Sequence, residues 1–244
     1  MNYFPTENEQ ERISGMDKSQ KTGHRERMRN RYLQAGGEGF PDYDLLELLL
    51  SYAVVRRDVK GVSRDLLQRY KSLTAIMDLS VEELSQIPGL GKRSALLIVL
   101  IREFCTRYLE ARVRESDLLQ SVDALKDYAR MKLAGARNEE MMLVCLDAKN
   151  HVISSRIISK GTVDSTVVYP RDIAAEALGC QASGIVLIHN HPSGVTDPSR
   201  SDRVFTKQIR DALRPLDIRL LDHLIVSRSD VYSFLENGLL EYSV

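Results

Sequence analysis

Two histidines lie one residue apart, at positions 189 and 191, where the apolar run IVLIHNH ends. Side chains at i and i+2 of a strand project from the same face, so His189 and His191 can hold one cation together. Imidazole suits zinc, and a catalytic zinc site needs a third protein ligand, with its fourth position left for water. The pattern predicts a metal site at the end of a buried strand. Asn190 falls on the opposite face, where we expect it to anchor the loop rather than to bind the metal.

A candidate third ligand lies at the start of the next predicted helix. The turn Pro-Ser-Gly follows His191, and Ser199 and Asp202 are three residues apart, so they share one face of that helix. Asp202 can close the metal site, which completes the spacing His-x-His, seven residues, Ser-x-x-Asp. A further histidine, His223 in the strand LDHLIV, is expected to orient that strand or to support the ligands.

This spacing resembles the motif of the JAMM metallopeptidases, which carry the MPN domain. The wording HNHPSG, the continuation PSRSD and the strand LDHLIV are similar to the RadC family within that class. The similarity extends to GHRERMRNRYL and DLLELLLSYA, so it spans about residues 22–244. It implies an α/β MPN domain of the JAMM, cytidine-deaminase-like type, in which His189, His191 and Asp202 bind Zn²⁺.

The resemblance also implies two catalytic residues. In the family a glutamate before the first strand of the domain is the general acid and base, and here Glu139 and Glu140 precede MMLVCLD. Counting back from Asp147 selects Glu139, and Glu140 is the alternative because a one-residue slip turns a side chain to the other face. Ser199 is expected to orient water or to stabilise the oxyanion. The predicted reaction is zinc-dependent hydrolysis of a peptide or isopeptide bond in a protein or peptide substrate.

A second pattern with possible chemistry is Ile-Pro-Gly-Leu-Gly, residues 87–91. Its glycines allow a tight turn, after which the free amides at the start of the next helix can hold a phosphate. This resembles the helix-hairpin-helix element, which contacts the DNA backbone without reading sequence. Gly89, Gly91, Lys92 and Arg93 are therefore candidate phosphate contacts, and the alternative is that the turn only packs two helices together.

Hydrophobic periodicity predicts helices throughout the N-terminal part, one of them opening with the capping-box pair Ser80 and Glu83. Further helices are predicted over residues 122–134, 169–180 and 197–213, and strands over residues 141–147, 151–159, 165–169, 185–191 and 219–227.

The predicted organisation has three parts. A flexible tail covers residues 1–22, an all-helical helix-hairpin-helix domain covers residues 23–115, and the α/β metallo-domain covers residues 122–244. The fold class is therefore mixed α+β.

The amino-acid composition excludes few classes of function, and it favours a cytoplasmic protein. Lysine and arginine number 34, as do aspartate and glutamate, so net charge gives no argument for nucleic acid or membrane binding. The densest basic stretch, residues 18–31, is either a solvated helix face or a phosphate-contacting surface. Cys105, Cys145 and Cys180 are widely spaced and suit buried thiols in a reducing compartment. No run resembles a signal peptide or a membrane span.

Four other functions compete with the hydrolase. HNH nucleases distribute their residues over a hairpin and a helix, so the adjacency in His-Asn-His counts against that class. Zinc deaminases need Cys-x-x-Cys, which is absent here. A non-catalytic MPN scaffold would have lost the ligands. The remaining alternative is a DNA-binding repair or recombination factor whose metal site is structural or acts on nucleic acid. Salt-sensitive retention on DNA would identify it.

Overall fold

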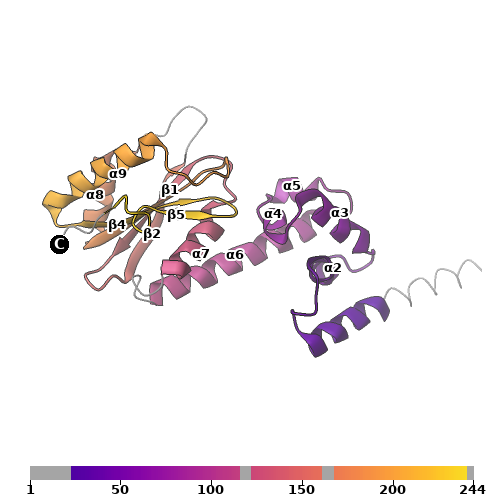
Figure 1. Cartoon of the computed structure of the whole chain (residues 1–244). Helices are drawn as coiled ribbons and strands as arrows, with labels where there is room; N and C mark the ends of the chain where they lie inside the picture. Colours follow the sequence, from indigo (N-terminus) through magenta and orange to yellow (C-terminus); the bar gives the residue numbers. More distant parts are fainter. Residues whose placement is uncertain (1–22, 116–121, 161–167, 241–244) are drawn as a thin grey trace, which may run out of the picture. The chain divides into compact units, whose positions relative to one another are not determined.

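The computed structural model describes residues 23–115, 122–160 and 168–240 (Figure 1). The predicted tail and most of the predicted strand over residues 165–169 lie outside these ranges.

The chain forms two compact units, residues 1–100 and 101–244. The division falls inside the helix α6 (Lys92–Glu115), whose last turns contribute Val113 to the core of the second unit. The domain boundaries expected from the sequence, at residues 115 and 122, stay a prediction.

The first unit is helical, as predicted. Its described part contains a helix over residues 23–35, then α2 (Asp42–Ala53), α3 (Lys60–Tyr70), α4 (Leu73–Met77), α5 (Val81–Ser85) and the start of α6. Helices α2 to α6 share one apolar core, formed by Leu46, Leu50, Val59, Leu66, Ile76, Leu84, Leu90, Ala95 and Ile98. The helix over residues 23–35 contributes Met28 to a separate cluster with Phe40 and Leu48. The predicted capping box is present at α5, where the Ser80 hydroxyl accepts from the Glu83 N–H at 3.1 Å and the Glu83 carboxylate accepts from the Ser80 N–H at 2.9 Å.

The second unit is built on a five-stranded mixed sheet in the order β2-β1-β3-β4-β5. The strands are β1 (Glu140–Leu146), β2 (Val152–Lys160), β3 (Gly184–Asn190), β4 (Arg219–Val226) and β5 (Val231–Ser233). Only β3 and β4 are parallel to each other, and the other neighbours are antiparallel. The short strand β5 was not predicted, because three residues carry too little periodicity to show a pattern.

Helices cover both faces of this sheet, which makes three layers. On one face α7 (Val122–Leu133) packs against side chains such as Val144 and Val186. On the other face α8 (Pro170–Gly179) and α9 (Arg200–Leu213) pack against Leu143 and Ile185. Since β3 is buried along its whole length, it reads in the sequence as a continuous apolar run. This confirms the mixed α+β class. No helix in the described ranges is long and apolar enough to cross a membrane.

Candidate metal centre

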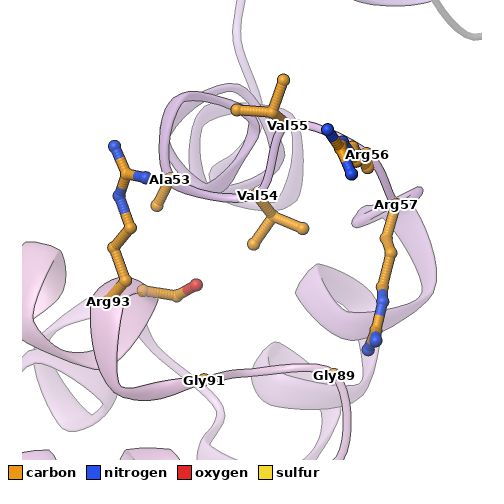
Figure 2. A pocket seen from close by; sticks show the side chains of 9 residues that line it. Ala53, Val54, Val55, Arg56, Arg57, Gly89, Gly91 and Arg93 are labelled. Carbon is orange, nitrogen blue, oxygen red and sulfur yellow. The ribbon is translucent and has the colours of Figure 1, made fainter.

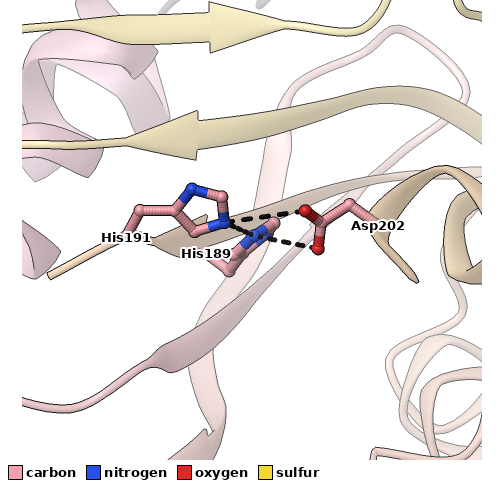
Figure 3. A group of neighbouring side chains, drawn as sticks. All are labelled: His189, His191 and Asp202. Carbon is pink, nitrogen blue, oxygen red and sulfur yellow. Dashed lines mark hydrogen bonds and ion pairs between the residues drawn. The ribbon is translucent and has the colours of Figure 1, made fainter. Parts of the chain in front are cut away.

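His189, His191 and Asp202 come together at the end of β3 (Figure 3). His189 is the last residue of that strand but one, and the N–H of His191 donates to the Val226 carbonyl of β4 at 2.9 Å. The two Nε2 atoms lie 2.9 Å apart. Asp202 Oδ1 is 3.4 Å from Nε2 of His189, and Oδ2 is 3.6 Å from Nε2 of His191. All three candidate ligand atoms lie within 4.8 Å of one another, so they could hold one metal ion.

A second capping box delivers Asp202 to this point. Ser199 is the N-cap of α9, and its hydroxyl accepts from the Asp202 N–H at 3.1 Å. In return Oδ2 of Asp202 accepts from the Ser199 N–H at 2.7 Å. The reciprocal bonds fix the carboxylate at the first turn of the helix, where the helix dipole also favours negative charge.

The backbone around His191 determines which ring nitrogen is available. Its Nδ1 lies 2.7 Å from the carbonyl oxygen of Val195. Because a carbonyl can only accept, Nδ1 carries the proton in this contact. The Nε2 of neutral His191 therefore presents a lone pair toward His189 and Asp202.

Charge and burial shift the pKa values of this group in opposite directions. Burial raises the pKa of Asp202, but its contacts with the rings of His189 and His191 and its hydrogen bond with Ser199 outweigh that effect and hold the carboxyl well below its ordinary range. The Asp202 hydrogen bond raises the pKa of His191 against the effect of burial, with further contributions from the Val195 carbonyl and the charge of Glu139. The carboxylate of Asp202 is thus ionised in the folded state.

The structure distinguishes the two candidate glutamates by their surroundings. Glu139 is exposed, and its negative charge acts on His191. Glu140 is the first residue of β1, and its carboxylate lies 3.7 Å from the Lys160 ammonium of β2. Of the two glutamates, Glu139 is the one whose charge raises the pKa of His191.

Asn190 holds the segment that carries Glu139. Its side-chain oxygen accepts from the Glu140 N–H at 2.7 Å, and its amide donates to the Asn138 carbonyl at 3.0 Å. The Asn190 side chain is buried, and the two bonds fix the peptides on either side of residue 139. At the end of β3, the His-Asn-His sequence therefore places two candidate ligands on one face of the sheet and an anchor for the Glu139 segment on the other.

Sequence reasoning missed one member of the site. The hydroxyl of Thr206 in α9 donates to the Asp202 carbonyl and lies 2.6 Å from Nδ1 of His223. Nε2 of His223 in turn lies 2.8 Å from Nδ1 of His189, so His223 lies beside a candidate ligand. Threonine four residues after a helical residue commonly bonds back to its carbonyl, so the first contact was predictable. The contact with a distant strand was not.

A second candidate site lies in the helical unit, around the glycine-rich turn. An open pocket of about 610 Å³ is lined there by Ala53, Val54, Val55, Arg56, Arg57, Gly89, Gly91, Arg93 and Ser94. Figure 2 shows Arg93 on one side of the pocket, Arg56 and Arg57 on the other, and the turn that carries both glycines along its base. Lys92, a predicted phosphate contact, is exposed but does not line the pocket.

The two glycines of this turn have different surroundings. Gly89 has a φ of +90°, and a Cβ there would lie 2.5 Å from Cγ2 of Val62, so this glycine is needed for packing against α3. A Cβ at Gly91 would meet no atom within 4 Å. The helix-packing explanation therefore accounts for Gly89 and leaves the space beside Gly91 unexplained.

Two of the four arginines in the described part of the basic stretch, residues 23–31, make contacts within the unit. Arg25 donates to backbone carbonyls of the segment after α2, including that of Val54 at 2.8 Å. Arg31 pairs with Asp44, and its guanidinium lies 4.2 Å from the centre of the Phe40 ring. These two arginines stabilise the helical unit.

Comparison with known proteins gives matches to both units. Residues 119–239 match the family described as RadC-like JAB domain, and residues 20–96 match the UPF0758 N-terminal family. The chain is 38% identical over 217 residues to UPF0758 protein SPO0054 of Ruegeria pomeroyi, which covers 89% of this chain and 97% of that protein. It is 34% identical over 232 residues to UPF0758 protein FN0909 of Fusobacterium nucleatum, covering 92% and 100%.

The fold and the family matches together define a protein in which a JAB or MPN-type domain follows a helical unit in the sequence. The chain belongs to the UPF0758 family, whose second domain is RadC-like. The resemblance seen in the sequence is thereby confirmed.

Proposed function

We propose that this protein is a zinc-dependent hydrolase of the JAMM type that cleaves peptide or isopeptide bonds. One observation carries the proposal: Nε2 of His189 and Nε2 of His191 lie 2.9 Å apart, with both oxygens of Asp202 facing them. Two ring nitrogens this close, beside an ionised carboxylate, are stabilised when one cation lies between them.

The chemistry of the donor set fits zinc. Two imidazole nitrogens and one carboxylate oxygen make three protein ligands, the number found in catalytic zinc sites, which keep a fourth position for water or substrate. A zinc ion held by His189, His191 and Asp202 would act as a Lewis acid that lowers the pKa of water and polarises a carbonyl.

Glu139 supplies the proton transfers in this proposal. Its carboxylate accepts a proton from the attacking water and later gives it to the departing amine. Its exposure leaves it accessible to substrate, and its charge acts on His191, whereas the carboxylate of Glu140 lies beside Lys160. The two hydrogen bonds of Asn190 support the role, since they hold the backbone on both sides of Glu139.

Ser199 stabilises the oxyanion in this proposal. Its oxygen accepts a hydrogen bond from the Asp202 N–H, so its own hydroxyl proton is not used by the cap. That proton can be donated to charge developing on the substrate oxygen, because Ser199 is exposed at the start of α9.

The test is zinc-dependent cleavage. Wild-type protein is stripped with a chelator, reloaded with zinc and incubated with a peptide library and with peptides joined through lysine side chains, and products are identified by mass spectrometry. We expect cleavage that disappears on stripping and returns on reloading. Bound zinc without any product, across both kinds of substrate, would contradict the proposed activity.

A second function, binding of a nucleic-acid backbone, is favoured by the pocket of the helical unit. The guanidinium groups of Arg56, Arg57 and Arg93 surround it, and no acidic side chain lines it. Ser94, also in the lining, is 2% exposed, and its hydroxyl makes no hydrogen bond with any described residue. Three positive charges, an unused hydroxyl and the first amides of α6 suit a phosphate.

Salt-dependent affinity for a duplex of arbitrary sequence tests this second function. Each phosphate contact contributes about 0.9 to the slope of log affinity against log salt. We expect Arg93→Gln and Arg56→Gln each to lower that slope by about this amount, and Lys92→Gln, outside the pocket, to lower it less. The pocket would be excluded as a binding site for the nucleic-acid backbone if the protein does not bind DNA at low salt, or if none of the three substitutions alters the binding.

A further inference from the structure

A continuous hydrogen-bonded chain links two of the candidate ligands through the protein interior. It runs from the Asp202 carbonyl to the Thr206 hydroxyl at 2.6 Å, and from that hydroxyl to Nδ1 of His223, also at 2.6 Å. It continues from Nε2 of His223 to Nδ1 of His189 at 2.8 Å. The helix α9 and the strands β3 and β4 each contribute to it.

The donor and the acceptor of each hydrogen bond in this series can be assigned, starting from the Asp202 carbonyl. A carbonyl oxygen only accepts, so the one proton of the Thr206 hydroxyl is directed to Asp202. Toward His223 the Thr206 oxygen must then accept, which puts a proton on Nδ1 of that ring. If His223 is neutral, its Nε2 is an acceptor, and His189 must donate from Nδ1.

The surroundings of His223 favour the neutral ring. The side chain is 0% exposed and stacks on Phe234 with the ring centres 4.8 Å apart. Thr206 is also buried, so water does not compete for these contacts. Within the described residues both nitrogens of the His223 ring have partners, which fixes the orientation of the ring as well.

We propose that Thr206 and His223 are positioning residues that set the tautomer of His189, so that its Nε2 lone pair faces the metal. The proposal rests on the proposed zinc site and adds how that site selects its protonation pattern. The opposite direction would put the proton of His189 on Nε2, where it would oppose metal binding. Because the Asp202 carbonyl orients the Thr206 hydroxyl, the residue that supplies one ligand also sets the tautomer of another.

The test combines imidazole nitrogen NMR with zinc titration. In zinc-free wild-type protein at alkaline pH, ¹⁵N shifts should show His223 and His189 protonated at Nδ1. Thr206→Val keeps the shape of the side chain but removes the hydroxyl. The variant should have a larger fraction of His189 in the tautomer protonated at Nε2, and it should bind zinc about 10-fold to 100-fold more weakly. Thr206→Ser restores the hydroxyl and should recover both the wild-type tautomer and the wild-type affinity.

Each result bears on one of the two claims. A wild-type spectrum with the His223 proton on Nε2 would overturn the proposed relay from Thr206 through His223 to His189. This measurement uses wild-type protein, so it does not depend on the folding of any variant. Equal tautomers and equal zinc affinity in wild type and Thr206→Val would overturn the relay as well. Wild-type protein that shows the expected tautomers but binds no zinc would instead contradict the proposed function.

Discussion

The helices α5 and α9 begin with the same capping device in different regions of the molecule. Ser80 and Glu83 form the first box, and Ser199 and Asp202 form the second, with nearly equal bond lengths. Only the second carboxylate belongs, among the described residues, to a group of side chains that could hold a metal.

A capping box can place a carboxylate beside other candidate ligands and keep its structural role. A capping carboxylate uses one oxygen for the backbone, and in α9 the other oxygen faces Nε2 of His189. The serine oxygen likewise accepts from the backbone and keeps its own proton. Whether a box is only structural therefore depends on what the sheet presents opposite it.

The largest expected difference between the two boxes concerns zinc. Asp202→Asn retains an oxygen that can cap the helix but removes the ligand charge, so zinc affinity should fall by more than the about 100-fold typical of losing a supporting residue. The matched change Glu83→Gln, in the first box, should leave zinc binding unchanged. Isothermal titration with zinc measures both, and equal affinities in the two variants would remove Asp202 from the site.

The next effect concerns Glu139, the proposed proton-transfer residue. Glu139→Gln should retain zinc and lower turnover by about 10²-fold to 10⁴-fold, the usual contribution of a general base. Glu140→Gln, one residue away and beside Lys160, should retain most of the activity. Turnover is measured on the substrate found for the wild type. A reversal of the two results would make Glu140 the base.

A smaller effect separates the two serines. Ser199→Ala and Ser80→Ala should each lower the unfolding free energy of their own unit by about 1 kcal/mol, because each removes an N-cap acceptor. Only Ser199→Ala should also lower turnover, by about 10²-fold to 10³-fold, if its hydroxyl stabilises the oxyanion. Denaturant unfolding and steady-state kinetics distinguish these outcomes. An unaltered rate in Ser199→Ala would restrict that serine to capping.

The smallest effect is a pH dependence of the zinc-free protein. The raised pKa of His191 gives stability that is fully present below about 6.5, its unfolded value, and is lost as pH rises through the folded pKa. The lowered pKa of Asp202 gives stability present above about 3.9 and lost as pH falls. The melting temperature of the zinc-free protein should therefore fall as the pH rises above about 6.5. His191→Gln should abolish this slope, and a persisting slope would assign it to other groups.

Much of the fold follows from the sequence because periodicity and local pairs encode it. The buried strand before His189, the helix after Ser199 and the capping box at Ser80 each depend on residues within a few positions. The His-x-His and Ser-x-x-Asp spacings likewise predicted which side chains meet at the candidate metal centre.

The relay through Thr206 and the pocket beside Gly91 could not be predicted in the same way. Each depends on residues brought together by packing, such as Thr206 of α9 with His223 of β4, or Arg56 with Arg93. No periodicity or short spacing relates such residues, since their proximity arises only when distant elements pack.

We propose that His189, His191 and Asp202 hold one zinc ion, and X-ray absorption at the zinc edge would show this binding without a known substrate. We expect about one zinc per chain, with two imidazole nitrogens at about 2.0–2.1 Å, oxygen ligands in the remaining positions and no sulfur. Protein that cannot be loaded with zinc, or zinc bound through thiolates at about 2.3 Å, would contradict it.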